Sequence, residues 1–158
     1  MKGIIKILIG LSIVIVLIQF VQPARNISGQ AMPNDISKII QVPLNVQGIL
    51  KKSCYDCHSN NTFYPWYANL QPINWLMNNH IKSGKNELNF NEFGSYTLRK
   101  QQNKLIAIEN SIKHGTMPLP SYLMIHKNAS LDNREKSILM RWLQISKDNI
   151  NYGNLNKK

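Results

Sequence analysis

Hydrophobic and polar residues are distributed along this chain in three distinct ways. Residues 4 to 21 are almost entirely apolar, with one lysine, one serine and one glutamine as polar interruptions. Residues 22 to 44 are polar and contain three prolines, a density that prevents long helices and favours extended backbone. From residue 45 onward, apolar residues recur at helical spacing. The pattern predicts a membrane anchor at residues 1–22, a tether at 23–44, a helical domain at 45–148 and a flexible tail at 149–158.

The apolar run at residues 4 to 21 would extend about 27 Å as a helix, close to the hydrocarbon thickness of a bilayer. Lys2 and Lys6 lie at its start, so the positive-inside rule places the N-terminus in the cytoplasm. Neither an Ala-x-Ala cleavage site nor a lipoprotein cysteine follows, which favours an uncleaved transmembrane helix over a signal peptide. The sequence therefore predicts a single-pass protein of the bacterial inner membrane with its C-terminal domain in the periplasm.

Two helices are expected in the first half of the domain. Apolar spacing predicts one at residues 46–56, which places Cys54 and Cys57 on its core-facing side. A second is expected at residues 73–82, with Gly84 as its terminator.

Two longer helices are expected in the second half. One runs from about Leu98 to His114 and is capped by Gly115. The other follows Asp132 and Glu135, which have the spacing of a capping box, and should pack on the first helix of the domain. The positions expected to be buried are Leu105, Ile108, Ile112, Ile138, Leu139, Trp142, Leu143 and Ile145. The lysines expected to face solvent are Lys100, Lys104 and Lys113.

The 158-residue chain is strongly basic, with 19 Lys and Arg against 8 Asp and Glu and a formal net charge of +11. This balance suits an acidic protein partner, an anionic membrane surface or a bound anionic cofactor. The basic residues form no dense stripe and no known nucleic-acid motif, so we expect no nucleic-acid partner.

The chemistry of the chain centres on Cys54-Tyr55-Asp56-Cys57-His58, which has the Cys-x-x-Cys-His spacing of covalent c-type haem attachment. In such sites two thiols add to the haem vinyl groups and the histidine binds the iron. The alternatives are a disulfide, a thioredoxin-like redox pair and a zinc site. These are the only cysteines, no βαβ pattern surrounds them, and the other histidines are scattered. We therefore predict one haem c held by Cys54, Cys57 and His58.

The second iron ligand is expected in the loop Thr116-Met117-Pro118-Leu119-Pro120. The proline holds Met117 in extended backbone, and such a rigid loop can direct a thioether at iron. Met117 is therefore the predicted distal ligand. The alternatives, in order, are Met124 and His126, then His114 and His80, or an open site.

An aromatic-rich loop follows the haem motif. It contains Tyr64, Trp66 and Tyr67, side chains that pair an apolar ring with a polar tip. The loop suits ordinary core packing or packing against the haem, and the polar tip of any one of the three could hydrogen-bond a propionate.

In the order of these features the chain resembles the haem-binding domain family of bacterial membrane-anchored, cytochrome c-like proteins. The resemblance implies an all-α, class I cytochrome c-like domain around one covalent haem, with His58 proximal and Met117 distal. Asn91 and Phe93 depart from the expected Ser and Trp but keep a capping residue and an aromatic ring. The residues that carry the resemblance are Cys54-Tyr55-Asp56-Cys57-His58-Ser59, Thr62, Tyr64-Pro65-Trp66-Tyr67, Pro72, Trp75, Gly84, Leu88-Asn89-Phe90, Gly115, Met117-Pro118, Tyr122, His126, Leu131 and Trp142.

These features favour a membrane-tethered electron carrier over an enzyme. His/Met ligation saturates the iron, and a thioether stabilises its reduced state. The basic surface would attract an acidic redox partner. The alternatives are a small-ligand sensor or peroxidase-like enzyme with an open or labile distal site, and a haem-stapled interaction module.

Overall fold

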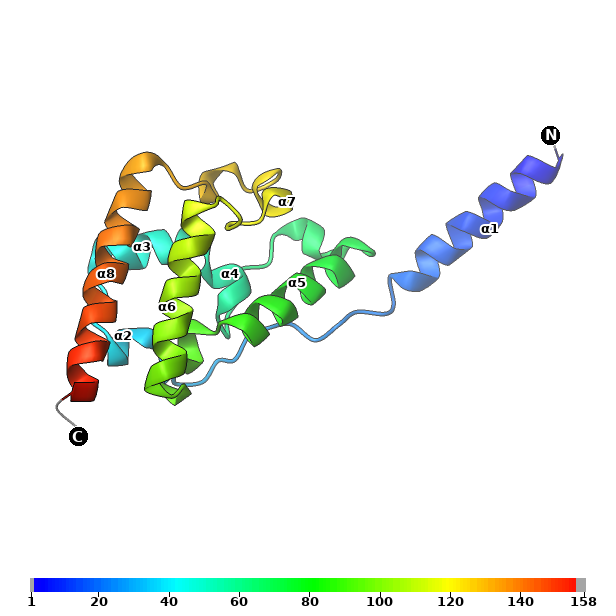
Figure 1. The fold of residues 1–158 in the computed structure, drawn as a ribbon. Coiled ribbons are helices and arrows are strands. Elements are labelled where there is room, and N and C mark those ends of the chain that lie inside the picture. Colours follow the sequence, from blue (N-terminus) through cyan, green and yellow to red (C-terminus); the bar gives the residue numbers. More distant parts are fainter. Residues whose placement is uncertain (1, 156–158) are drawn as a thin grey trace.

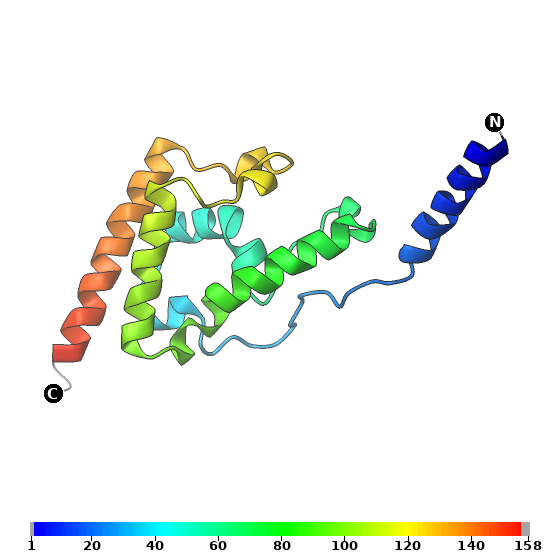
Figure 2. The same ribbon diagram turned by 45° about the vertical axis from the view of Figure 1, so that its right-hand side comes forward.

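The structure, a computed structural model, describes residues 2–155 and the side chains of residues 2–150. This part of the chain is all-helical, apart from one isolated bridge between Ile27 and Asn61. In Figures 1 and 2, α1 stands apart from the other helices at the end of an extended segment. The α-helices are α1 (Lys2–Ile18), α2 (Ile36–Ile39), α3 (Leu44–Ser53), α4 (Tyr55–His58), α5 (Ile73–Glu87), α6 (Leu98–Lys113), α7 (Pro120–Leu123) and α8 (Asn133–Leu155). Three 3₁₀ helices join them: η1 (Trp66–Asn69), η2 (Phe90–Ser95) and η3 (Lys127–Ala129).

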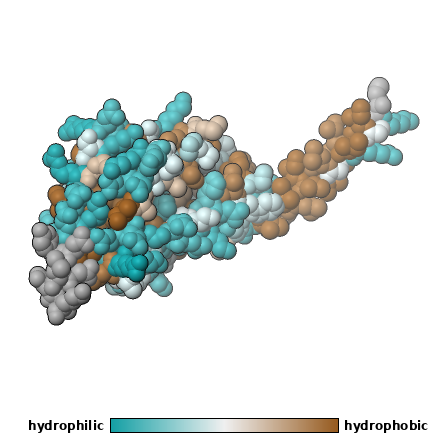
Figure 3. Space-filling view, in the orientation of Figure 1, coloured by the Kyte–Doolittle hydropathy of each residue, from teal (hydrophilic) through white to brown (hydrophobic). Residues whose placement is uncertain are grey.

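The predicted transmembrane helix is not supported. Helix α1 has 17 residues and ends at Ile18, short of the expected run to residue 21. Because Lys6 lies within it, its uncharged apolar stretch is only about 18 Å long, against a hydrocarbon core of about 30 Å. Within residues 2–155, no helix is both long and apolar enough to cross a bilayer, although α1 is conspicuously hydrophobic in Figure 3. This finding also overturns the single-pass inner-membrane localisation with a periplasmic domain.

The chain after α1 is fixed to the start of α5. The backbone N–H of Gln71 donates to Gln19 Oε1 at 2.9 Å. In return, Gln71 Nε2 and Trp75 Nε1 donate to the carbonyl oxygen of Val21, at 2.8 and 3.0 Å. These bonds hold residues 19–21 outside the helix.

Asn26 then joins this segment to the loop that follows the haem motif. Its Nδ2 donates to the carbonyl oxygen of Ser59 at 2.8 Å and to Thr62 Oγ1 at 2.9 Å. Its backbone N–H donates to Tyr64 Oη at 2.8 Å, and Lys85 Nζ donates to its Oδ1 at 2.6 Å. A segment predicted as a tether therefore contributes hydrogen bonds to the domain.

The core lies where α2, α3, η2, α6 and α8 meet. Helices α6 and α8 run side by side in both ribbon views, and α8 also contacts α3, as expected for the last helix. Ile36 and Ile40 are buried, so the chain before residue 45 adds to the packing. The largest fully buried side chains of the core are Phe90, Phe93, Ile36, Leu50, Leu105, Leu139, Leu143 and Val46.

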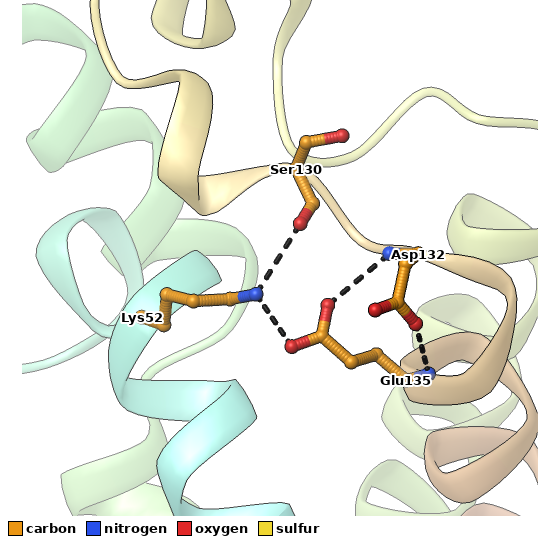
Figure 4. A network of polar contacts seen from close by, with 4 residues as sticks. All are labelled: Lys52, Ser130, Asp132 and Glu135. Carbon is orange, nitrogen blue, oxygen red and sulfur yellow. Dashed lines mark hydrogen bonds and ion pairs between the residues drawn. The ribbon is translucent and has the colours of Figure 1, made fainter.

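Helix α8 begins with the predicted capping box. The backbone N–H of Glu135 donates to Asp132 Oδ1 at 2.7 Å, and that of Asp132 donates to Glu135 Oε2 at 3.1 Å. Lys52 of α3 adds a 2.5 Å ion pair with Glu135 and a 3.3 Å bond to the Ser130 carbonyl oxygen (Figure 4). Because Lys52 lies two residues before Cys54, the network ties the haem motif to α8.

Several helix boundaries differ from the predictions. The helix expected at residues 46–56 breaks at Cys54, where φ is −130°, into α3 and α4. Helix α5 continues through Gly84 to Glu87. Helix α6 ends as expected, with Gly115 in the left-handed region at a φ of 65°.

The end of α8 also differs from its predicted form. The helix continues to Leu155, beyond the expected start of a tail at residue 149, while residues 156–158 of that tail lie outside the described residues. Ile145 was expected in the core but is 54% exposed, and Ser146 and Ile150 are buried on the inward face instead.

Candidate haem site

The pentapeptide of residues 54–58 is a single tight turn. Cys54 ends α3, and its carbonyl oxygen accepts hydrogen bonds from the backbone N–H groups of Cys57, at 3.3 Å, and His58, at 3.0 Å. This turn brings both thiols and the imidazole to the wall of one cavity.

His58 is oriented by the chain after α5. Its Nδ1 lies 2.9 Å from the carbonyl oxygen of Leu88, and its ring meets Phe90 edge to face at 6.3 Å between centroids. Because a carbonyl can only accept, Nδ1 carries the proton and donates. The lone pair of Nε2 is then available for a metal, which is the usual arrangement of a histidine ligand.

The cavity has a volume of about 420 Å³. Its wall is mainly aliphatic and aromatic, with side chains from α3, α5, α6, the loop before α7, and α8. Met117 enters it from the predicted loop and is 39% exposed. The structure therefore brings Cys54, Cys57, His58 and Met117 to one space.

The alternative distal ligands are placed less favourably. Met124 is 77% exposed, and His114 is an exposed residue whose Nδ1 contacts the carbonyl oxygen of Asn110 at 2.8 Å. Neither lines the cavity, whereas His80 of α5 does.

His126 belongs to a hydrogen-bonded latch that we define as Asp56, Tyr67, Tyr122 and His126. Tyr122 Oη donates to Asp56 Oδ2 at 2.7 Å, and the Tyr122 ring stacks on His126 with 4.0 Å between centroids. His126 Nε2 lies 2.7 Å from Tyr67 Oη. Burial and the bond to Asp56 raise the pKa of Tyr122, so its hydroxyl stays protonated and donates. The latch holds α7, and with it the Met117 loop, against the haem motif.

A family model described as a haem-binding domain matches residues 13–145. The chain belongs to the haem-binding domain family. No curated protein and no solved structure gives a significant match. The structure is all-helical, as predicted, and the class I cytochrome c-like topology stays a prediction.

The residues of this haem-binding domain fit a haem. Its cavity has an apolar wall for a porphyrin, two thiols at one side and an imidazole with a free Nε2. Within the described part of the chain, no cluster of three or more His, Cys, Asp or Glu side chains forms a metal site. A zinc site would need such a cluster.

The environment of the thiols differs from that of reactive cysteines. Burial raises the pKa of Cys54 to about 12 and that of Cys57 to about 11, with smaller contributions from Cys57 and Asp56 respectively. Redox-active pairs instead have lowered pKa values in electropositive surroundings. This observation argues against a thioredoxin-like role.

Sequence reasoning missed the latch and the role of Gly84 in the haem-binding domain. A Cβ at position 84 would lie 2.7 Å from the carbonyl oxygen of Cys57, so the backbone of α5 passes directly over the haem motif. A glycine inside a helical pattern can signal such close approach as well as the helix end predicted at this position. The only sequence signal for the latch is the four-residue spacing between Tyr122 and His126.

Proposed function

We propose that this haem-binding domain carries one covalently attached haem c and transfers electrons. Cys54 and Cys57 form the thioether links, His58 Nε2 is the proximal ligand, and Met117 Sδ is the distal ligand. The main support is the placement of these four side chains around one apolar cavity, with His58 Nδ1 already held by Leu88.

A bound haem supplies a one-electron iron couple, and the residues of the chain set its properties. The Leu88 carbonyl fixes the tautomer and ring orientation of His58. Leu50, Phe90, Leu131 and Leu139 exclude water from the cavity wall. A thioether ligand favours the reduced state, which suits an electron carrier.

The redox partner is proposed to be an acidic protein. From residue 45 onward the chain has 15 basic and 7 acidic residues, a net charge of +8. Such a surface accelerates encounter with an acidic partner, and the association rate should fall as salt rises.

The test is the full chain produced together with a cytochrome c attachment system, since residues 19–28 bind to the domain. Haem that stays with the polypeptide on a denaturing gel in the wild type, and is absent from a Cys54→Ser/Cys57→Ser variant, would support covalent attachment. Haem lost from both proteins would contradict it.

Optical spectra then test the distal ligand. We expect a weak long-wavelength band of sulfur bound to ferric iron, and no reaction of the ferrous protein with carbon monoxide. Met117→Ala should lose the band and bind carbon monoxide, whereas Met124→Ala, at an exposed position outside the cavity, should behave like the wild type. Rapid carbon monoxide binding by the wild type would instead indicate an open site and the sensor or peroxidase-like alternative.

A further inference from the structure

The wall of the haem cavity contains a cation that sequence reasoning placed in solvent. Lys104 of α6 lines the cavity, and its side chain is only 22% exposed. Among the residues whose side chains are described, no other lysine or arginine lines it.

Within residues 2–150, Lys104 has only one long ion pair, although most of its side chain is covered. Its Nζ lies 3.5 Å from Glu87 Oε2, on a side chain that is 82% exposed, and it makes no hydrogen bond within the described part of the chain. By contrast, Lys147 (15% exposed) and Lys52 (30% exposed) each have a carboxylate oxygen at 2.5 Å. Since its ammonium donates no hydrogen bond to a described residue and has only one distant carboxylate beside it, Lys104 has donors left for a further anion.

The haem has two carboxylates of its own, at a different edge of the porphyrin from the vinyl groups. The two cysteines would fix the vinyl edge beside α3 and α4. We propose that Lys104 Nζ of α6 binds a haem propionate, an inference that rests on the proposed covalent haem. Charge-assisted bonds from ammonium to carboxylate are among the stronger hydrogen bonds in proteins.

The neighbouring groups leave this role to Lys104. Ser83 and Ser111 add hydroxyls from α5 and α6. The other titratable side chains around the cavity are Asp56, His58, His80, Glu87, Tyr122 and the two thiols. The two carboxylates among these, those of Asp56 and Glu87, would repel a propionate.

The aromatic loop that holds the other candidates for a propionate bond lies elsewhere. Tyr64, Trp66 and Tyr67 do not line the haem cavity. The hydroxyl of Tyr64 accepts the backbone N–H of Asn26, and that of Tyr67 contacts His126. Both polar tips are therefore already engaged.

The test compares Lys104→Gln with Lys113→Gln in the haem-loaded full chain. Lys113 is on the same helix, is 55% exposed and pairs with Glu109 at 2.9 Å, outside the cavity, so the two variants lose the same charge. The measurement is the reduction potential as a function of pH. Lys104→Gln should lower it at neutral and alkaline pH, because an uncompensated carboxylate stabilises ferric iron, and the difference should shrink as acid protonates the propionate.

Equal potentials in Lys104→Gln and Lys113→Gln at every pH would overturn the proposal. If Lys104→Gln fails to load haem, Glu87→Gln is the second test variant. Glu87 is largely exposed, so removing its charge should leave the fold intact. Removing this competing carboxylate should strengthen the Lys104–propionate pair and raise the potential, and an unchanged potential would count against the pair. Wild-type protein that retains haem on a denaturing gel shows that covalent attachment has succeeded. The outcomes above then concern the Lys104–propionate pair alone.

Discussion

Residue 84 has no room for a side chain, because α5 crosses the haem motif at this point. The Cβ of an alanine would lie 2.7 Å from the Cys57 carbonyl oxygen and 3.2 Å from Cys57 Cβ. Both atoms belong to a rigid turn, so α5 must shift. We expect Gly84→Ala to reduce the free energy of unfolding by about 1–3 kcal/mol and to lower haem loading. Urea unfolding and the ratio of haem to protein absorbance measure the two effects.

Gly48→Ala is the matched control for this prediction. Gly48 lies inside α3, and a Cβ there would meet nothing within 4 Å. The substitution should raise stability by about 0.5–1 kcal/mol, because alanine loses less backbone entropy in a helix. Equal effects of both substitutions would show that the contact between α5 and the haem motif is looser than described.

The two thiols provide a second prediction at this scale. Burial raises the pKa of Cys54 to about 12 and of Cys57 to about 11. In haem-free protein, iodoacetamide should therefore react slowly at neutral pH, with a rate that rises steadily into the alkaline range. A rate that levels off near neutral pH would reveal an activated thiolate and favour the redox pair. Because folding raises both pKa values, their contribution to stability is complete below pH 9.0 and is lost as the pH rises through 11 to 12.

At the scale of elements, the short helix α7 depends on the latch. Tyr122 donates a 2.7 Å hydrogen bond to Asp56 of the haem motif. None of the residues of α7 is buried, so this bond is its main attachment. Tyr122→Phe should cost about 1.5–3 kcal/mol, as expected for a hydrogen bond to a charged group, and free the Met117 loop. In the haem-loaded protein the sulfur band should weaken, and carbon monoxide should bind faster than in the wild type.

Tyr96→Phe serves as the control for the latch. Tyr96 Oη accepts the backbone N–H of Asn89 at 3.0 Å, away from α7. Its loss should reduce stability but leave carbon monoxide binding unchanged. If the two variants bind carbon monoxide alike, the latch has no part in holding Met117.

The elements also show which features the sequence could predict. Spacing and capping identified α6, Gly115 and the capping box of α8, because these depend on residues close together in the chain. Haem binding was predicted from residues 54–58, a motif with a fixed chemical spacing. The length of α1, the passage of α5 over Cys57, and the burial of Lys104 depend on contacts between distant segments. Local pattern does not specify which distant segments meet.

At the scale of the whole molecule, the cavity interrupts the core. About 420 Å³ lies among Leu50, Phe90, Leu131 and Leu139, which are core residues as well as cavity residues. Without haem these side chains lose packing partners, because an apolar wall gains little from water. Haem should therefore stabilise the fold as well as supply its redox chemistry.

The haem-free variant Cys54→Ala/Cys57→Ala tests this prediction. We expect a lower thermal midpoint than in the haem-loaded wild type. The near-UV circular dichroism should fall more than the far-UV signal, because helices α3, α6 and α8 keep their mutual contacts while their side chains lose fixed packing. Binding of free haem should then raise the midpoint in proportion to the logarithm of its concentration. His58→Ala with both cysteines restored is the complementary variant, since it removes the proposed iron ligand but leaves the two thiols proposed for attachment. A haem-free variant as stable and as well ordered as the loaded protein would show that the helices form a complete core alone. Haem would then contribute nothing to the stability of the fold.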